Sequence, residues 1–228
     1  MVDKRVVIIG GHGRIALLAA PKLAGAGFAV DAVIRNPEHA DDVAAAGAAP
    51  VVLDVEASGV EELAELFSGA EAVVFSAGAG GGNPARTRAV DYEAAVRTMQ
   101  AAEQAGVRRY VMVSYARSET DVHTLDPKDS FYPYAEAKHH ADEHLRGTDL
   151  DWTILGPGRL TQEPATRKVT VLGSDEISGL VAQSGPEAAA TSRENVAEAI
   201  LHVLSTGAAV RSTVNFFDGD IPLEEAVR

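Results

Sequence analysis

The stretch Val6-Val7-Ile8-Ile9-Gly10-Gly11-His12-Gly13-Arg14-Ile15-Ala16 joins a short apolar run to a helical pattern through a glycine-rich turn. The apolar run predicts a buried strand, and the alanine- and leucine-rich residues 14–26 predict the helix that follows it. Glycine at Gly10 permits a tight turn, Gly13 lets the backbone approach a pyrophosphate, and the small Ala16 lets the helix pack closely on the sheet.

The amides of the first helical turn and the positive end of that helix are suited to hold an anion. The alternative is a glycine-rich turn with no ligand, but the strand before it and the helix after it favour dinucleotide binding. The candidate cofactor contacts in this loop are Gly10, His12, Gly13, Arg14 and Ile15.

The same alternation of strand and helix continues along the chain. Strand-like runs lie near 28–34, 50–53, 72–75, 110–113 and 152–155, and helical stretches lie near 37–46, 60–67, 86–105 and 134–146. This pattern predicts an α/β fold with a doubly wound, mostly parallel sheet, the Rossmann fold, carrying a small C-terminal elaboration on the substrate side.

We expect one domain over residues 1–228. Within it, residues 156–190 are rich in Gly, Pro, Ser and Thr and predict an irregular segment that shapes the substrate pocket, with one short strand near 168–172. A helix near 193–204 is expected to resume behind a cap at Thr191 or Ser192. Asn36, followed by Pro37, is expected to cap the second helix.

Composition narrows the class of protein. The chain has no cysteine, which excludes a disulfide framework and a thiolate metal site. Its first apolar run is too short for a signal-peptide core or a membrane span, so we predict a cytoplasmic protein without a membrane partner. The formal charge of −13 disfavours nucleic acid and leaves a small-molecule substrate as the expected partner. The oligomeric state stays open.

The residues after the second strand favour one cofactor over another. NAD-dependent enzymes place a carboxylate there for the ribose 2′-hydroxyl, whereas this chain has Arg35, whose guanidinium suits a 2′-phosphate. Asp31 lies four residues earlier, within the strand. We therefore predict NADP rather than NAD, with a solvent-exposed Arg35 as the alternative.

Several motifs together resemble those of one family. The G-x-x-G-x-x-A turn is followed by Ile34-Arg35-Asn36-Pro37, Leu53-Asp54-Val55, Phe75-Ser76-Ala77-Gly78, Val90-Asp91-Tyr92 and Tyr134-Ala135-Glu136-Ala137-Lys138. Nearly the whole chain resembles the atypical short-chain dehydrogenases/reductases, in the NAD(P)H-binding subgroup that includes epimerase/dehydratase-like proteins. The resemblance implies that Asp54 and Val55 meet the adenine and that Ala77 and Gly78 line the cofactor.

The resemblance also implies a catalytic set of Ser114, Tyr134, Lys138 and Asp91. The tyrosine exchanges a proton with the substrate oxygen, the lysine holds the nicotinamide ribose, and a serine orients the carbonyl. Asp91 stands where relatives with a full active site have asparagine, so its part in a proton relay is open.

The spacing of the tyrosine and the lysine has a chemical meaning of its own. Tyr134 and Lys138 are four residues apart and share one face of a helix, so an ammonium beside the phenol is expected to lower its pKa from about 10. A chance Tyr-x-x-x-Lys pair is the alternative. Ser114 directly follows its strand and either orients the substrate or bonds to backbone; Ser118 lies in the same loop.

Residues 140–144 spell H-x-x-E-H, a pattern that can hold zinc on a suitable helix. No matching ligand follows it in this Rossmann context, so we predict a solvated helix face and no metal.

The sequence thus predicts an NADP(H)-dependent oxidoreductase that reduces a carbonyl or related small molecule by hydride transfer. Two alternatives stay open: a flavin or quinone reductase in which Tyr134 is dispensable, and a regulatory protein that senses NADP(H) without turnover.

Overall fold

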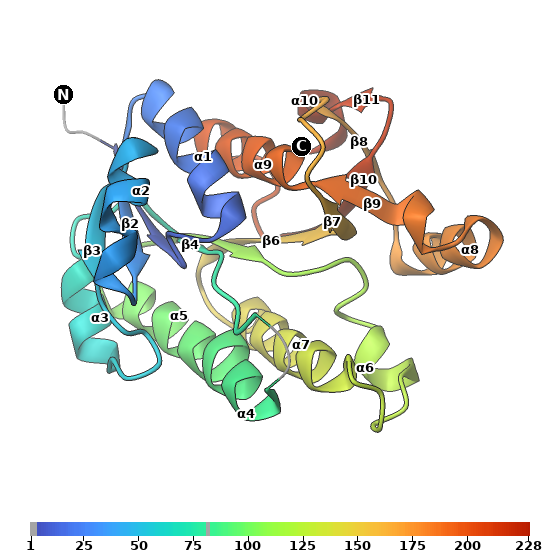
Figure 1. Ribbon diagram of the computed structural model, residues 1–228, viewed down its shortest axis with the longest axis horizontal. Coiled ribbons are helices and arrows are strands. Elements are labelled where there is room, and N and C mark those ends of the chain that lie inside the picture. Colours follow the sequence, from blue (N-terminus) through green and yellow to red (C-terminus); the bar gives the residue numbers. More distant parts are fainter. Residues whose placement is uncertain (1–3, 81–82) are drawn as a thin grey trace.

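Strands from both halves of the chain form one large sheet between two layers of helices (Figure 1). The computed structural model describes residues 4–80 and 83–228. The strands are β1 (Lys4–Ile9), β2 (Phe28–Ile34), β3 (Ala49–Val52), β4 (Ala72–Phe75), β5 (Arg109–Val113), β6 (Asp151–Pro157), β7 (Arg159–Thr161), β8 (Lys168–Val171), β9 (Ala190–Ser192), β10 (Ser212–Asp218) and β11 (Ile221–Pro222).

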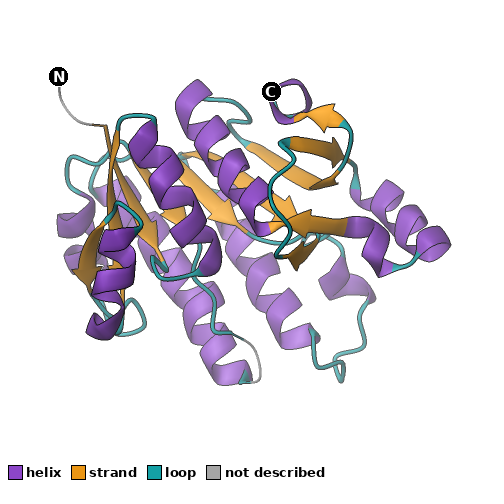
Figure 2. Ribbon diagram, turned by 45° about the horizontal axis from the view of Figure 1, so that its top comes forward, coloured by secondary structure: helices purple, strands orange, loops and turns teal. Residues whose placement is uncertain are grey.

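Helices cover both faces of this sheet (Figure 2). They are α1 (Arg14–Gly25), α2 (Ala40–Ala45), α3 (Val60–Phe67), α4 (Pro84–Thr87), α5 (Ala95–Gln104), α6 (Asp121–Thr124), α7 (Tyr132–Arg146), α8 (Ser174–Ser184), α9 (Arg193–Thr206) and α10 (Leu223–Ala226). A π-helix, Arg88–Ala94, joins α4 to α5. In the part of the chain that the structure describes, no helix combines the length and the apolar character needed to span a lipid bilayer.

The strand order of the large sheet is β11-β8-β10-β6-β5-β4-β1-β2-β3. The strands from β10 to β3 in this order are parallel, and β8 runs antiparallel to both of its neighbours. The chain winds outward from β1 in one direction through β2 and β3, and in the other direction from β4. This confirms the predicted doubly wound Rossmann fold, whose ligand crevice lies where the order reverses.

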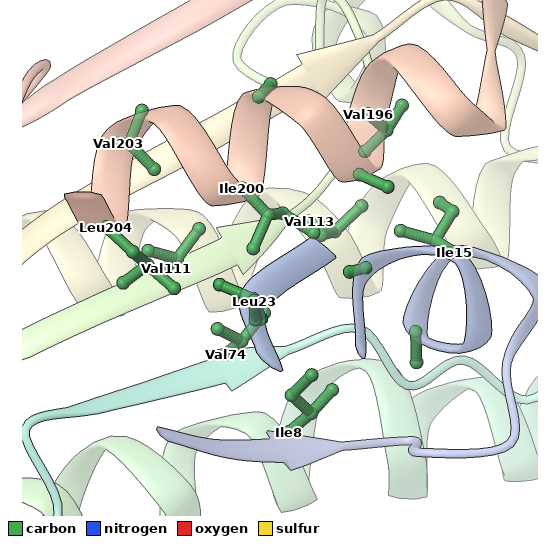
Figure 3. Packing of buried hydrophobic residues seen from close by; sticks show 14 of the residues in the cluster. Ile8, Ile15, Leu23, Val74, Val111, Val113, Val196, Ile200, Val203 and Leu204 are labelled. Carbon is green, nitrogen blue, oxygen red and sulfur yellow. The ribbon is translucent and has the colours of Figure 1, made fainter. Parts of the chain in front are cut away.

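The two faces of the sheet have separate cores, and β1 contributes to both. Val6 and Ile8 pack with α1, α2 and α9, whereas Val7 and Ile9 pack with α3, α5 and α7. Figure 3 shows the first of these cores, with Ile8 below α1 and Ile200 on α9. Burial on both faces explains why the central strands are almost uniformly apolar, and each buried Val or Ile stabilises the fold by about 1.5–3 kcal/mol.

Two predicted helix starts are confirmed. The Asn36 side chain accepts a hydrogen bond from the Glu38 amide ahead of a short 3-10 turn, Pro37–His39. The Ser192 hydroxyl accepts hydrogen bonds from the amides of Glu194 and Asn195 and begins α9. Both caps satisfy amides that have no partner within their helix.

The prediction that residues 156–190 are irregular is wrong. The predicted short strand is present as β8, but the segment also holds β7 and the eleven-residue helix α8. Helix α8 contains Gly179 and few apolar residues, and it is held by Ile177 and Val181, which pack beside Phe217 of β10. A helix stabilised mainly by such a distant contact leaves a weak signal in its own sequence.

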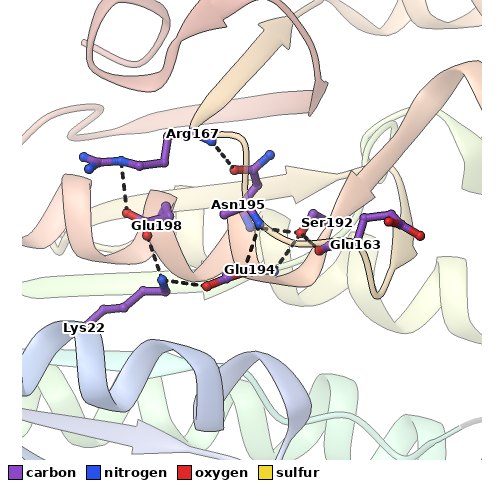
Figure 4. Close-up of polar contacts among 8 residues, drawn as sticks. Lys22, Glu163, Arg167, Ser192, Glu194, Asn195 and Glu198 are labelled. Atoms are coloured by element: carbon purple, nitrogen blue, oxygen red, sulfur yellow. Dashed lines mark hydrogen bonds and ion pairs between the residues drawn. The ribbon is translucent and has the colours of Figure 1, made fainter.

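Polar contacts fix α9 against α1 (Figure 4). The Lys22 ammonium donates to Glu194 at 2.9 Å and to Glu198 at 2.7 Å. Burial acts to lower the pKa of Lys22, but the hydrogen bonds that its ammonium donates to the two carboxylates outweigh this effect, and the pKa is raised. Arg167 pairs with Glu198 from the loop before β8, so one carboxylate joins three segments of the chain.

The turn after β1 depends on the absence of a side chain at Gly10. Gly10 has a φ of +83°, and a Cβ there would lie 2.6 Å from the Ala77 Cα in the loop after β4. Gly27, after α1, has a similar φ of +88° with nothing within 4 Å of the corresponding position. Both glycines have a positive φ, but only Gly10 has a close backbone neighbour. Comparing substitutions at the two positions therefore distinguishes the cost of the φ angle from the cost of the close contact.

We expect Gly10→Ala to lower the free energy of unfolding by about 2–4 kcal/mol, because a strained φ and an overpacked contact add together. Gly27→Ala should cost only about 1 kcal/mol, since it has the strain without the contact. Urea unfolding of both variants measures the difference. If both variants lost the same free energy of unfolding, the close contact between Gly10 and Ala77 would not limit the size of the side chain at position 10.

Candidate active site

The loops at the carboxyl ends of β1, β2, β3 and β4 enclose two adjoining cavities of about 230 and 160 Å³. The cavities share Gly10, Val33, Arg35, Ala77 and Gly78 and lie where the strand order reverses. Together they form an elongated site, hereafter the cleft. Its lining includes eight of the residues predicted to contact the cofactor: Gly10, His12, Gly13, Arg35, Asp54, Val55, Ala77 and Gly78.

The amino end of α1 opens at this cleft and fits a diphosphate. Gly13 precedes the helix in an extended conformation, no side chain caps the helix, and its first turn has no acidic residue. Its amides are therefore left for an anion. The Arg14 side chain is exposed here, whereas the Ile15 side chain is buried in the core, so a contact from Ile15 would come from its backbone.

The end of the cleft lined by Asp54 and Val55, where the adenine is predicted to bind, carries two arginines around one carboxylate. Arg35 donates to Glu56 Oε1 at 2.7 Å, and Arg86 donates to the same oxygen at 3.0 Å. The Arg35 side chain is 55% exposed. Arg86 and Glu56 were not predicted, because Arg86 arrives from α4, far away in the sequence.

Two histidines pack together beside Arg35. The rings of His12 and His39 stack with centroids 3.7 Å apart, and His12 Nε2 lies 2.9 Å from a carboxylate oxygen of Asp42. His12 was predicted as a cofactor contact, whereas His39 shows no ligand spacing in the sequence. Both line the cleft because the 3-10 turn after β2 folds back over the β1 turn.

Asp91 holds the loop that follows β4. Its side chain is buried in the π-helix and accepts a hydrogen bond from the Ala79 amide at 3.0 Å. Burial raises the pKa of Asp91, and the nearby Lys138 opposes the shift. The predicted role in a proton relay stays a prediction; the observed contact positions the Ala77–Ala79 backbone beside the cofactor cleft.

The serine and the lysine of the predicted catalytic set lie in a buried polar cluster under the end of β5. The Ser114 hydroxyl donates to Asp142 at 2.6 Å, and the Lys138 ammonium donates to the Val113 carbonyl at 2.8 Å. Lys138 is only 1% exposed and lines none of the cavities beside the strand ends. Its contact with the nicotinamide ribose stays a prediction.

Asp142 belongs to the H-x-x-E-H stretch on α7. Its carboxylate is fully buried, and burial raises its pKa while Lys138 and the hydroxyl of Ser114 oppose the shift. His140 of the same stretch lies on the other side, against Tyr92. Across residues 4–80 and 83–228, no group of three or more metal-binding side chains comes together.

The prediction that Lys138 lowers the pKa of Tyr134 is wrong for this arrangement. Burial raises the pKa of the Tyr134 phenol well above its usual value, and the carboxylates of Asp91 and Asp142 add to the shift. The lysine shares a helix face with the tyrosine, but its ammonium is bound to a strand carbonyl and balanced by those two carboxylates. Tyr134 is therefore held as a neutral phenol.

A third cavity, of about 540 Å³, lies beside the cleft and is hereafter called the substrate pocket. Ser114 and Tyr134 line it, as do residues from the loop after β5 and from the predicted pocket-forming segment 156–190. Tyr115, Phe131 and Tyr134 pack their rings against one another with centroids 5.3–5.5 Å apart. Phe217 and Arg193 complete the wall and come from later elements than the sequence indicated.

The glycine turn lies where the strand order reverses, the helix after it has no side-chain cap, and a pocket lies nearby. A comparison of the sequence with known protein families gives the same indication of a dinucleotide-binding protein. The family model described as NAD(P)H-binding matches residues 10–206. The chain belongs to this NAD(P)H-binding family.

Several proteins are similar to this chain along nearly their whole length. The UPF0659 protein C216.03 of Schizosaccharomyces pombe is 32% identical, covering 97% of this chain and 92% of its own length. The uncharacterized sugar epimerase YhfK of Bacillus subtilis is 30% identical, covering 98% and 99%. A structure from Bacillus halodurans, described as an NAD-dependent epimerase/dehydratase, is 29% identical over 97% of each chain with a TM-score of 0.85.

These findings support an atypical short-chain dehydrogenase/reductase family of NAD(P)H-binding proteins, as the motifs indicated. They support enzymatic activity of the oxidoreductase or epimerase kind without naming a substrate. The choice of NADP over NAD and the catalytic roles of Ser114, Tyr134, Lys138 and Asp91 stay predictions.

The buried Asp142 predicts a pH dependence of stability. Because its pKa is raised in the folded state, the folded protein binds this proton more tightly than the unfolded chain does. The resulting stability is present below the ordinary aspartate value of 3.8 and is lost as pH rises through the folded value.

We expect Asp142→Asn to become more stable relative to the unsubstituted protein as pH rises from about 4 to about 8. The amide oxygen of Asn still accepts from Ser114. Asp220→Asn, at an exposed turn, serves as the control for loss of one negative charge. Urea unfolding at several pH values measures this, and parallel curves for Asp142→Asn and the unsubstituted protein would contradict it.

Proposed function

We propose that this protein is an NADPH-dependent reductase of a small carbonyl compound. The observation that carries the proposal is the position of Tyr134, a protonated phenol lining a 540 Å³ pocket beside the glycine cleft. A neutral phenol suits the delivery of a proton to a carbonyl oxygen, and it suits proton abstraction poorly. This asymmetry favours reduction over oxidation.

The preference for NADPH is argued from charge at the adenosine end. Arg35 and Arg86 bring two positive charges to one carboxylate oxygen of Glu56. A 2′-phosphate can pair with both guanidiniums, whereas a 2′-hydroxyl offers no charge. Glu56 could receive such a hydroxyl, but the same oxygen is already shared by the arginines.

Different residues bind the cofactor and carry out the proton transfer. The α1 amides and Arg14 hold the diphosphate, Asp54 and Val55 meet the adenine, and Asp91 holds the loop at Ala77 and Gly78. The reduced nicotinamide, when bound, supplies the hydride. Tyr134 donates the proton to the carbonyl oxygen, and the aromatic wall keeps water from the reacting carbon.

One observation favours a second candidate, a flavin or quinone reductase. Ser114 donates its proton to Asp142, so in this arrangement its hydroxyl does not donate to a carbonyl oxygen in the pocket. A ring system that accepts hydride directly needs neither Ser114 nor Tyr134.

For the cofactor, we expect NADPH to raise the melting temperature more than NADH at equal concentration. Arg35→Gln should weaken NADPH binding by about tenfold and leave NADH binding nearly unchanged, because only the phosphate contact is lost. Arg108→Gln, which removes an exposed arginine paired with Asp151 far from the cleft, is the control. Equal binding of both cofactors would refute the NADPH preference.

For the chemistry, we expect Tyr134→Phe to lower kcat for aldehyde reduction by about 10²- to 10⁴-fold while NADPH affinity is kept. Tyr132→Phe, on the first turn of the same helix, should leave kcat unchanged. Stopped-flow and steady-state oxidation of NADPH measure both. Unchanged kcat in Tyr134→Phe, together with turnover of free flavin or a quinone, would replace the carbonyl mechanism with the second candidate.

A further inference from the structure

The substrate pocket is positively charged in a strongly negative protein. Its lining includes Arg117, Arg159 and Arg193 but only one carboxylate, Asp121. The whole chain has 33 acidic and 20 basic residues. The negative charge of the whole protein repels anions at long range, so an anion can be bound only by positive groups close to it. The positive lining of the pocket therefore indicates a site for an anion.

The three arginines differ in how their charge is balanced. Arg117 pairs with Asp121 at 2.8 Å, and Arg159 pairs with Glu187. Arg193, at the first turn of α9, makes no ion pair with any side chain in residues 4–80 and 83–228. Its Nη1 donates only to the backbone carbonyls of Leu160 and Thr161, at 3.3 and 2.9 Å.

The surroundings of Arg193 add to this charge. Arg193 is half-buried, and its pKa is lowered by burial and by the positive charge of Arg14, which belongs to the first turn of α1. The guanidinium of Arg193, in the substrate pocket, and that of Arg14, at the amino end of α1, therefore repel each other. An anion placed in the pocket beside Arg193 would balance this charge.

The rest of the pocket is suited to an apolar body. The packed rings of Tyr115, Phe131 and Tyr134 form one part of the lining. Phe217 and Ile177, which belong to one buried cluster, form another. A hydroxyl-rich sugar would leave many of its polar groups without partners between such walls.

We propose that the substrate is an aromatic or similarly apolar carbonyl compound bearing a carboxylate, which pairs with Arg193. This inference rests on the proposed reductase function for the carbonyl, but the anion site can be tested without turnover. Arg193 fixes the substrate by its carboxylate, and the aromatic rings hold the body of the molecule so that its carbonyl faces Tyr134.

Binding tests the anion site alone. Isothermal titration of the NADP⁺-loaded protein with 2-naphthoate and with 2-naphthamide compares two ligands of one shape and different charge. We expect the carboxylate to bind about 10- to 100-fold more tightly, the range for a charge-assisted contact. Arg193→Gln should abolish this ratio, and Arg193→Lys should restore most of it.

Arg159→Gln is the matched control, because it removes a pocket arginine whose charge Glu187 already balances; it should change the ratio by about twofold or less. NADPH affinity and the melting temperature of each variant report on the cofactor cleft and the fold. A ratio near one in the unsubstituted protein, or a ratio that survives Arg193→Gln, overturns the inference. So does a loss of NADPH affinity in Arg193→Gln that matches its loss of naphthoate affinity.

Turnover then separates this inference from the proposed function. With 6-formyl-2-naphthoic acid and its methyl ester, we expect a lower KM for the acid, lost in Arg193→Gln with little change in kcat. If neither aldehyde is reduced while naphthoate still binds selectively through Arg193, carbonyl reduction fails and the anion site stands. If both are reduced with equal KM, the reductase stands and the anion site fails.

Discussion

The close approach of two backbone segments at the centre of the sheet determines the rest of the site. At Gly10 the turn after β1 lies so near to Ala77 that a Cβ would be 2.6 Å from its Cα, and at Gly11 a Cβ would be 2.6 Å from the Ala32 side chain. The turn after β1 can therefore lie against both the loop after β4 and strand β2 at the point where the strand order reverses. Their backbone, with the amino end of α1, forms a narrow cleft that suits an extended phosphate-bearing cofactor.

Some sites of the protein carry positive charge although the protein as a whole is strongly negative. The net charge of −13 would repel a phosphorylated cofactor at long range. The three places proposed to hold an anion nevertheless carry positive groups: the α1 amino end, the Arg35 and Arg86 pair, and Arg193. Under the same strand ends, Asp91 and Asp142 lie in the interior beside Lys138; burial raises the pKa of both carboxyl groups, and the positive charge of Lys138 opposes the shift.

The Tyr134 and Lys138 pair shows how spacing can be right and its chemical interpretation wrong. Four residues on a helix do place the two side chains on one face. The ammonium, however, lies under β5 and donates to the Val113 carbonyl, and two buried carboxylates balance its charge. What surrounds a charge in three dimensions, and not its neighbour along the helix, decides the pKa of the phenol.

The sequence by itself determined the β-α alternation, the glycine turn, the caps at Asn36 and Ser192 and the family. Each of these depends on residues close together in the chain, whose apolar period or backbone freedom is local. Only the tertiary structure decided the pairing of Arg35 with Glu56 and Arg86, the bond from Ser114 to Asp142, the helix α8 and the place of Arg193 in the pocket. These features depend on segments that are far apart in the sequence and are brought together when the sheet packs. The sequence around a charged residue, or within a weakly predicted helix, does not show which distant segment it will contact.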